Sequence, residues 1–347
     1  MTAVAVIDRA AFARNVRRLV ERAAPAEVML AIKADAYGHG MLDLAPVALA
    51  AGARSLAVLE IPAALALREA GIDCRLFAWL HGTGSDFAAA IAAGIDLGVS
   101  APWQLDAIAS AASTARPARV HLKIDTGLRR NGALPEQWPA LVRQARELAE
   151  TGRIVIDGIW SHLADASVEA DDAAIAVFEA AIATAEALGV SPPLRHLAAS
   201  SAGWREPRAR FDLVRFGIAA YGVSPFDDRS GLDLGLEAVM TLRTTVMDAA
   251  APSGRSWIAA GYADGVPAAA QGAEVSIDGH RCAVEAVEVD RTLVVSPPSV
   301  EPGAVVTVFG EPAAGVPSAE DWARWSRTIG DEILTGVPAR VPRSAVG

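Results

Sequence analysis

The sequence has few cysteines and no apolar run long enough to cross a membrane. Its 347 residues include two cysteines, Cys74 and Cys282, which lie far apart in the chain. A distant pair of this kind is more often two buried thiols than a disulfide framework. No segment holds about 18 uncharged apolar residues, and the N-terminus lacks the basic and apolar regions of a secretory signal. We therefore expect neither a disulfide scaffold nor a membrane protein, and we expect the protein to be cytoplasmic.

Positive charge is also scarce. The chain has 31 Lys and Arg residues against 41 Asp and Glu residues, for a formal net charge of −10. Nucleic-acid-binding proteins concentrate Lys and Arg, so nucleic acid is not an expected partner. Hydrophobic residues make up 52% of the chain and charged residues 21%, as in an ordinary globular protein. At about 150 residues per domain, the length suggests two domains.

The first part of the chain alternates short aliphatic runs with helix-length segments. After a predicted helix over residues 10–24, eight such runs are predicted to be strands, and none is joined to the next by a hairpin turn. This pattern favours a parallel (β/α)8 barrel of the TIM type over an open doubly wound sheet. The first predicted strand ends at Lys33, and the others cover residues 55–59, 75–79, 96–99, 120–124, 154–160, 194–198 and 213–216.

The pattern changes after Tyr221. Residues 224–231 form a turn-rich linker, and alternating apolar and polar residues beyond it predict a mainly antiparallel β domain. We divide the chain into domains at 1–225 and 226–347, with the first few residues as candidates for pairing with the second domain. One helix is predicted within this domain, over residues 319–334, and its apolar face consists of Trp322, Trp325, Ile329 and Ile333.

Lys33 stands at the end of the first predicted strand. The apolar run from Val28 to Ile32 leads directly into this lysine, and the polar, Gly-containing segment Ala34 to Gly40 follows it. A lysine in this position is fixed by the scaffold and partly desolvated, which lowers its pKa and makes it a usable amine for Schiff-base chemistry. From these residues alone, a solvated lysine at a strand end is the simpler interpretation.

Polar residues also follow the last two predicted strands of the barrel. Phosphate sites in such barrels are built from the loops after strands seven and eight. Here Ser200 supplies a hydroxyl, and Gly217 and Ile218 can offer backbone amides. A phosphate-bearing cofactor that faces Lys33 would be pyridoxal phosphate. The alternative for Ser200 and Gly217 is a capping serine and a turn glycine.

Other chemistries have weaker support in the sequence. The segment Gly38-His39-Gly40 lacks the third glycine of a dinucleotide fingerprint. His162 and Asp165 could belong to a metal site, but no Cys cluster or His-Glu-x-x-His spacing completes one, so no metal is expected. Ser161 and His162 cannot act as nucleophile and base through adjacency, because neighbouring strand residues point to opposite faces.

Two motifs resemble those of the alanine racemase family, the fold-type III pyridoxal-phosphate enzymes, and the resemblance covers nearly the whole chain. Lys33-Ala-Asp-Ala-Tyr-Gly-His-Gly40 resembles the family's cofactor-lysine motif, and Gly261-Tyr-Ala-Asp-Gly265 resembles its second catalytic motif. The resemblance implies that Lys33 binds pyridoxal 5′-phosphate and that Lys33 and Tyr262 of the other subunit are the two bases that interconvert L- and D-alanine. It also implies a homodimer with composite sites that supplies D-alanine for peptidoglycan.

The resemblance gives roles to further residues. Arg215 would face the pyridine nitrogen as a permanent cation and leave the ring largely unprotonated. Arg130 would lie near the cofactor's phenolic oxygen and the substrate carboxylate, held by Lys123, which is often carbamylated in the family. Val284 would bind the substrate carboxylate. The phosphate would contact Tyr37, Ser200, Gly217, Ile218 and, as a further candidate, Ser201. His162 and His196 would belong to a hydrogen-bonded series behind Tyr262.

Four positions depart from the family pattern. Ala199 replaces an asparagine, Ala268 an arginine, Val284 a methionine and Ala339 a tyrosine that many members carry. Val284 and Ala339 remove bulk from the side that normally admits only alanine. A racemase of the same fold for other amino acids therefore stays open as an alternative. A non-catalytic pyridoxal-phosphate-binding barrel is a third hypothesis, which the second domain and Tyr262 argue against.

Overall fold

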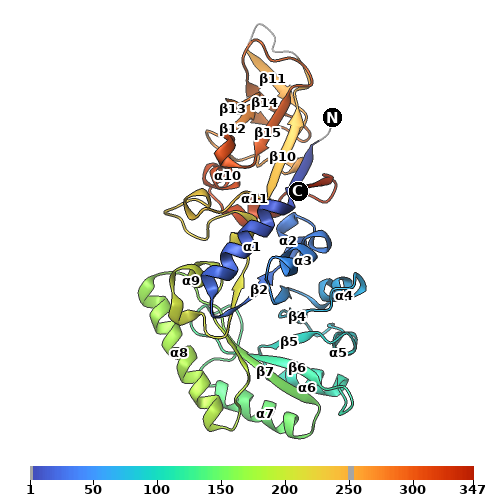
Figure 1. Cartoon of the computed structure of the whole chain (residues 1–347), viewed down its shortest axis with the longest axis vertical. Helices are drawn as coiled ribbons and strands as arrows, with labels where there is room; N and C mark the ends of the chain where they lie inside the picture. Colours follow the sequence, from blue (N-terminus) through green and yellow to red (C-terminus); the bar gives the residue numbers. More distant parts are fainter. Residues whose placement is uncertain (1–2, 249–253) are drawn as a thin grey trace. The chain divides into compact units, whose positions relative to one another are not determined.

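The computed structural model describes residues 3–248 and 254–347, which form two compact units (Figure 1). The barrel unit comprises Arg17–Lys33 and Ala48–Gly217. The β unit comprises the residues up to Val16, Ala34–Val47 and the chain from Ile218 onward. Both units therefore contain segments that are distant in sequence, and helix α1 (Arg9–Ala23) contributes to both.

Eight parallel strands form the barrel. Their order is β8-β7-β6-β5-β4-β3-β2-β9. Backbone hydrogen bonds from Asp212 N to Arg195 O (3.1 Å) and from Arg215 N to Ala198 O (3.0 Å) close the ring between β8 and β9. The predicted (β/α)8 barrel is confirmed. The strands are β2 (Glu27–Ala31), β3 (Ser55–Val58), β4 (Arg75–Ala78), β5 (Asp96–Val99), β6 (Ala118–Lys123), β7 (Ile154–Trp160), β8 (Leu194–His196) and β9 (Leu213–Phe216).

The helices between the strands carry ordinary amphipathic and capping signals. In α7 (Trp138–Glu150) the buried residues Trp138, Leu141, Val142 and Ala145 follow helical spacing. In α8 (Val168–Ala187) the Ser167 side chain accepts a hydrogen bond from Ala170 N. Besides the left-handed segment α2 (Lys33–Gly38), the others are α3 (Met41–Ala50), α4 (Ile61–Glu69), α5 (Phe87–Ala92), α6 (Pro102–Ala111) and the short α9 (Ser200–Arg205). None of the helices in the described part of the chain combines the length and apolar character that crossing a bilayer requires.

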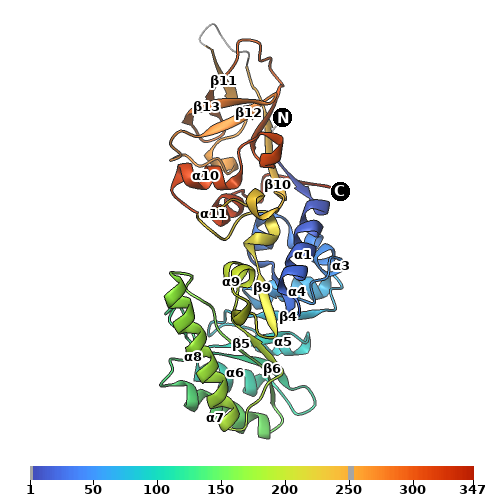
Figure 2. The same cartoon turned by 60° about the vertical axis from the view of Figure 1, so that its left-hand side comes forward.

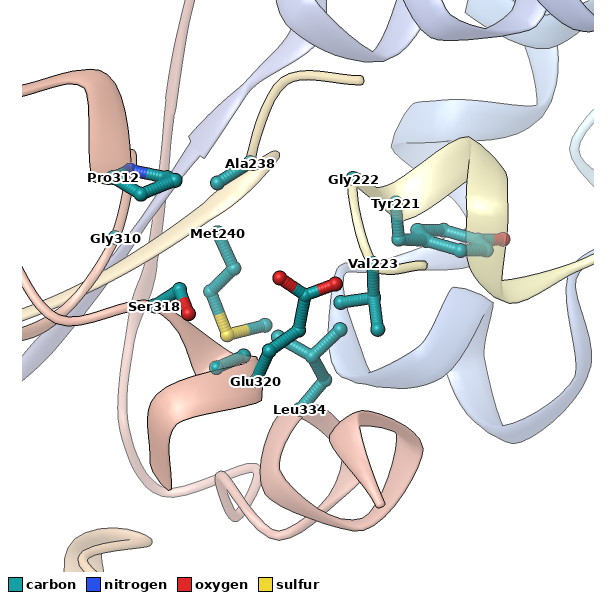
Figure 3. A pocket seen from close by; sticks show the side chains of 11 residues that line it. Tyr221, Gly222, Val223, Ala238, Met240, Gly310, Pro312, Ser318, Glu320 and Leu334 are labelled. Atoms are coloured by element: carbon teal, nitrogen blue, oxygen red, sulfur yellow. The ribbon is translucent and has the colours of Figure 1, made fainter. Parts of the chain in front are cut away.

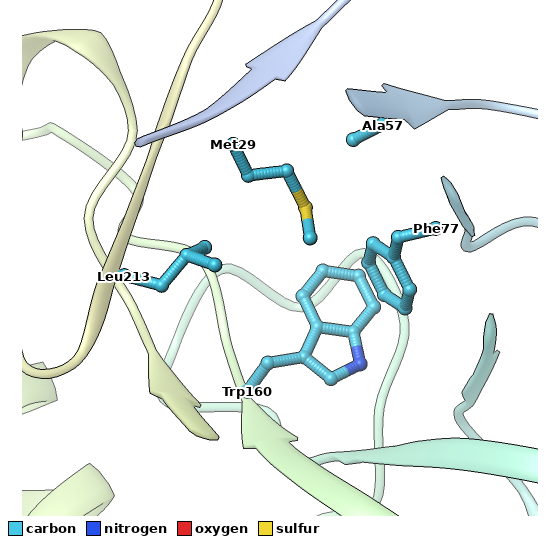
Figure 4. Close-up of a cluster of buried hydrophobic side chains, with 5 residues drawn as sticks. All are labelled: Met29, Ala57, Phe77, Trp160 and Leu213. Carbon is cyan, nitrogen blue, oxygen red and sulfur yellow. The ribbon is translucent and has the colours of Figure 1, made fainter. Parts of the chain in front are cut away.

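The barrel interior is packed with side chains. Met29, Ala57, Phe77, Trp160 and Leu213, from five different strands, converge there and are at most 3% exposed (Figure 4). Burying a side chain of the size of Phe or Leu contributes about 1.5–3 kcal/mol. The interior is therefore a core and not a channel, which leaves the carboxyl ends of the strands for a functional site.

The β unit contains a second eight-stranded sheet, in the order β11-β14-β13-β12-β15-β10-β1-β16. Figure 2 labels its strands β10, β11, β12 and β13. Its neighbours pair antiparallel, except that β16 runs parallel to β1. The mainly antiparallel character predicted for this part is confirmed. The strands are β1 (Val4–Asp8), β10 (Met240–Thr245), β11 (Arg255–Ile258), β12 (Glu274–Ile277), β13 (His280–Val287), β14 (Thr292–Val295), β15 (Val305–Phe309) and β16 (Arg343–Val346).

The single helix predicted over residues 319–334 is wrong, because the structure divides this segment into α10 (Ala319–Ser326) and α11 (Gly330–Thr335). Arg327 ends α10 in a left-handed conformation, with φ 55°. The amide of Thr328 then donates to Ala323 O, which closes the helix end. Ile329, predicted on the apolar face, lies between the two helices and is 62% exposed.

Candidate active site

Lys33 follows strand β2 and begins the short segment α2 (Lys33–Gly38). The strand ends at Ala31, before the predicted lysine, although Ile32 N still donates to Ala57 O on the neighbouring strand (2.9 Å). The next four residues, Ala34 to Tyr37, all have left-handed backbone angles, with φ between 51° and 55°. Left-handed residues other than glycine cost about 1–2 kcal/mol each, and such strain is concentrated at functional sites.

Local hydrogen bonds hold this left-handed turn. Gly40 N donates to Asp35 O (3.0 Å), and Met41 N donates to the Asp35 carboxylate (2.7 Å). The Nδ1 atom of His39 lies 2.9 Å from the carbonyl oxygens of both Ala36 and Tyr37. His39 is fully buried, and burial lowers its pKa to about 4. Its imidazole is therefore neutral and serves the turn.

Lys123 ends strand β6 and is almost completely buried. Its Nζ donates to Asn131 Oδ1 and lies 4.4 Å from the centre of the Trp160 ring. Burial, and then the positive charges of Arg130 and Arg215, lower the pKa of Lys123 to about 7. A substantial fraction of the Lys123 amine is therefore neutral near neutral pH.

Arg215, on strand β9, directs its four terminal N–H bonds to protein acceptors. Nη1 donates to His196 Nδ1 (2.9 Å) and His196 O (3.0 Å). Nη2 donates to Ser161 O (2.6 Å) and Leu197 O (2.9 Å), and lies 3.3 Å from His162 Nδ1. No described residue accepts a hydrogen bond from Nε. Of the five donors of the guanidinium, the Nε–H group is therefore left for a ligand.

Four cations, Lys33, Lys123, Arg130 and Arg215, form what we call the cation cluster. Burial, followed by the charges of these four residues, holds the pKa of His162 well below its ordinary value. His162 is therefore a neutral imidazole among cations. Arg215 stays charged at neutral pH even though burial and Arg130 lower its pKa to about 9. Such a cluster suits an anionic ligand, because phosphate and carboxylate oxygens accept strong hydrogen bonds from these groups.

Ser200 and Gly217 connect the loops that follow β8 and β9. Both residues are buried, and Gly217 N donates to Ser200 Oγ (3.0 Å). Since the hydroxyl oxygen accepts this bond, its proton can be donated to a ligand. Ile218 is the next residue in the chain and opens the 3-10 helix Ile218–Tyr221 of the β unit.

Tyr37 and Tyr262 belong to the β unit and differ sharply in exposure. Tyr37 is buried, and its ring centre lies 4.8 Å from that of Tyr221. Burial and the charge of Asp331 raise the pKa of Tyr37. Tyr262 is 52% exposed and begins the 3-10 helix Tyr262–Asp264. Its phenol is thus accessible to a group outside the β unit.

The residues around Tyr262 explain the Gly-Tyr-Ala-Asp-Gly motif. The amide of Gly261 donates to Asp264 Oδ2 (2.9 Å), and Arg340 Nη2 lies 2.9 Å from Asp264 Oδ1. A Cβ atom on Gly261 would lie 2.3 Å from Glu288 O, so a side chain is excluded there. Gly265 has φ 98°, which favours glycine. The motif therefore builds a rigid turn that presents one tyrosine.

Val284, the position expected to bind the substrate carboxylate, lies within strand β13. Its amide donates to Ala273 O (2.8 Å), so a substrate would compete with the sheet for it. Sequence reasoning missed Val289, which is 52% exposed and whose carbonyl accepts from Ala263 N (2.9 Å), next to Tyr262. No described residue accepts from Val289 N.

A small pocket in the β unit is not a candidate for this chemistry. It lies between α10, α11 and strand β10, and it is lined largely by apolar groups such as Val223, Met240 and Leu334 (Figure 3). The carboxylate of Glu320, which points into it, accepts from Ser224 N (2.7 Å) and Gly231 N (2.9 Å). The Glu320 carboxylate therefore holds the loop that contains Ser224 and Gly231 in place.

Comparison with known proteins agrees with these features. The model of the alanine racemase N-terminal domain matches residues 7–225, and that of the alanine racemase C-terminal domain matches residues 244–345. The chain belongs to the alanine racemase family. The alanine racemases of Beutenbergia cavernae and Thermobifida fusca are each 41% identical to it, with 99% of this chain and 97% and 98% of those proteins covered. The resemblance predicted from the two motifs, and the enzyme class of isomerase, are confirmed.

Solved structures of family members agree in fold. The alanine racemase of the D-cycloserine producer Streptomyces lavendulae superposes with a TM-score of 0.96 at 36% identity, covering 100% of this chain and 97% of that chain. The alanine racemase of Streptomyces coelicolor A3(2) gives a TM-score of 0.94 at 38% identity, covering 100% and 98%. The likeness extends over the whole chain, including both family motifs.

The scarcity of lysine is a second signal that sequence reasoning missed. The chain contains two lysines, Lys33 and Lys123, among its 31 basic residues, and both belong to the cation cluster. All other cationic side chains are arginines, which stay protonated and cannot serve as amines. Any amine chemistry of a side chain in this protein must therefore use one of these two residues.

Proposed function

We propose that the protein is a pyridoxal-phosphate-dependent racemase that interconverts L- and D-alanine as a homodimer. The observation that carries the proposal is the cation cluster, with the Nε–H of Arg215 left for a ligand. A cofactor with a phosphate, a phenolic oxygen and a ring nitrogen offers acceptors for each of these groups. In this proposal the barrel of residues 1–225 holds the cofactor and residues 226–347 bring Tyr262 to the partner subunit.

The residues present fit such a cofactor. Arg215 Nε would donate to the ring nitrogen, and Arg130 would face the phenolic oxygen and the substrate carboxylate. The residues that would bind the phosphate are Tyr37, Ser200, Gly217 and Ile218. When bound, the cofactor withdraws electrons from the substrate's Cα and so makes its proton removable. The protein's task is then to bind, orient and exchange that proton.

Racemisation requires a base on each face of Cα. In our proposal Lys33 moves the proton at its Nζ on the face of the D-substrate, and Tyr262 of the partner subunit does so at its Oη on the face of the L-substrate. An ordinary tyrosine, with a pKa of about 10, is a poor base unless its anion is favoured. Nearby cations favour a phenolate. In our proposal Arg215 supplies the positive charge, and the neutral His162 and His196 position it.

The substrate is the least constrained part of the proposal. We infer alanine, and a role in supplying D-alanine for peptidoglycan in the cytoplasm, from the family to which the chain belongs. Four small residues, Ala199, Ala268, Val284 and Ala339, stand where the family pattern has larger or polar ones. They favour, as a second candidate, a racemase of the same fold with a wider choice of amino acids.

A substrate panel separates these candidates. We expect purified holoenzyme to racemise L-alanine at least about tenfold faster than L-serine or larger L-amino acids, since one methylene in a fitted pocket changes rates by about 10–200-fold. The measurement is chiral chromatography of each product mixture. Comparable rates across the panel would refute alanine specificity. No racemisation of any amino acid by cofactor-loaded protein would instead support the non-catalytic hypothesis.

The low pKa of Lys123 gives a pH-dependent prediction. We expect Lys123 to add CO2 and form a carbamate, which would be held by Arg130. The neutral amine is required, so the carbamate should increase as the pH rises through about 7 and disappear well below it. Carbon-13 NMR of protein equilibrated with labelled bicarbonate measures this. The Lys123→Met variant is the control, and an equal signal from that variant would contradict the assignment.

A further inference from the structure

A line of buried polar groups leads from Arg215 through His196 into the barrel, to His121 and Asp96, which have no role in the proposed function. His196 Nε2 lies 2.9 Å from His121 Nδ1, and His121 Nε2 lies 3.2 Å from Asp96 Oδ2. These groups come from strands β8, β6 and β5. His121 and His196 are 0% exposed and Asp96 is 2% exposed. Water does not reach these buried side chains, so their polar atoms must find their hydrogen-bond partners among the protein groups of the line.

The barrel is shaped to make room for this line. The register between β6 and β7 shifts after Val120, so that Val120 pairs with Ile156 but His121 pairs with Gly158. Such a bulge redirects a side chain. A Cβ atom on Gly158 would lie 2.2 Å from His121 Nδ1, so only glycine leaves space for the imidazole. Trp160 stacks on His196 at 5.8 Å, and Phe77 packs on both imidazoles.

The protons along the line have one consistent arrangement. Arg215 can only donate, so His196 Nδ1 must accept and His196 carries its proton on Nε2. That N–H donates to His121 Nδ1, which leaves the proton of His121 on Nε2, where it donates to Asp96. Burial, and then the charge of Arg215, hold the pKa of His196 well below its ordinary value, in agreement with a neutral ring. All donors thus point from Arg215 toward Asp96.

Asp96 ends the line and is fixed by two arginines. Arg75 Nη1 lies 2.6 Å from Asp96 Oδ2, and Arg119 Nε lies 3.0 Å from Asp96 Oδ1. Both arginines also pair with Asp157, which makes no hydrogen bond to either histidine. Asp96, His121 and Asp157 together have the composition of a metal site. Their carboxylates are already neutralised by the two guanidinium groups, which would repel a cation, so we assign no metal.

We propose that Asp96 and His121 are positioning residues for Arg215, because they fix the tautomer of His196 and thereby the orientation of the guanidinium. The opposite tautomer of His196 would set its Nδ1–H against an N–H of Arg215 and release that side of the guanidinium. The Nε–H offered to a ligand would then lose its fixed direction. This inference adds positioning residues to the proposed active site. The changes in kcat that it predicts rest on the proposed function.

A pair of substitutions at His121 tests this role. Leucine removes both ring nitrogens, whereas asparagine keeps an acceptor close to the position of Nδ1 and can still accept from His196. We expect His121→Leu to lower kcat at least about tenfold, the effect typical of losing an outer positioning contact. We expect His121→Asn to recover most of this loss, although it too loses the bond to Asp96. Equal losses in the two variants would overturn the proposal.

A second pair keeps the test valid if His121→Leu does not fold. Asp96→Leu and Asp157→Leu each remove one carboxylate from the same two arginines, but only Asp96 accepts a hydrogen bond from His121. Leucine leaves no acceptor, so we expect a lower kcat only in Asp96→Leu. Equal kcat values for these two variants would mean that the ion pairs are structural and would overturn the proposal.

Nitrogen-15 NMR of histidine-labelled holoenzyme reads the tautomer directly, without turnover. The chain has six histidines, so a His196→Gln variant identifies the signals of His196. We expect a neutral His196 with the proton on Nε2 in the wild type and in His121→Asn, and a changed tautomer in His121→Leu. A wild-type proton on Nδ1 would overturn the inference. Absence of racemase activity in the wild type would instead refute the proposed function. The two failures can be told apart, because the NMR experiment reports the tautomer of His196 whether or not the enzyme turns over.

Discussion

Replacing Lys33 with alanine is expected to abolish racemisation and the visible absorption band of the protein-bound cofactor. Lys33 is proposed both to bind the cofactor covalently and to move a proton at Cα. Loss of a general base alone typically costs about 10²–10⁴-fold in rate, and the covalent role adds to that. We therefore expect kcat to fall by at least about 10⁴-fold. The phosphate contacts at Ser200 and Gly217 would remain, so weakened cofactor binding should still be measurable by dialysis.

The small number of lysines makes this experiment unusually clear. Borohydride reduction fixes a cofactor that is bound through an imine, and peptide mass analysis then identifies the attachment point. Lys123 is the other lysine of the chain, so Lys123→Met is the matched control and should still trap cofactor. Cofactor trapped on the Lys33→Ala variant would show that the lysine assignment is wrong.

The barrel could be predicted from the sequence because its signal is repeated. Each strand is a short aliphatic run followed by a helix-length segment, and burial on both faces of parallel strands keeps those runs apolar. The polar residues at strand ends could also be found, since they interrupt the pattern where a barrel is known to place its site. Ser200 and Gly217 are an example, because the loops after β8 and β9 do bring them within one hydrogen bond.

Other features could not be predicted from the sequence. The left-handed turn from Ala34 to Tyr37 opposes the intrinsic preference of alanine and is held by His39 and Asp35. The line from Arg215 to Asp96 joins residues that are far apart in sequence, and a histidine within an apolar strand gives no indication of its partner. Val289 was missed because only the folded chain shows that its side chain is exposed and that no described residue accepts a hydrogen bond from its amide.

Tyr262→Phe is expected to cause the other large loss. The ring is half exposed, and its hydroxyl has no hydrogen-bond partner among the described residues, so its removal should change stability by less than about 0.5 kcal/mol. Cofactor binding should be intact, while racemisation should fall by about 10²–10⁴-fold in both directions, since each turnover needs both bases. Proton NMR in deuterated water adds a sharper test. D-alanine should still exchange its Cα proton through Lys33, whereas L-alanine should not.

Mixed dimers test whether Tyr262 acts across subunits. Neither Lys33→Ala nor Tyr262→Phe protein should be active alone. A dimer with one subunit of each kind would contain one intact site, formed by Lys33 of the Tyr262→Phe subunit and Tyr262 of the Lys33→Ala subunit. Random exchange makes about half of the dimers mixed, with one of two sites restored, so about a quarter of the wild-type activity should return. No recovery in demonstrably mixed dimers would mean that Tyr262 serves its own subunit or is not a base, whereas unchanged turnover of Tyr262→Phe itself would refute the two-base scheme.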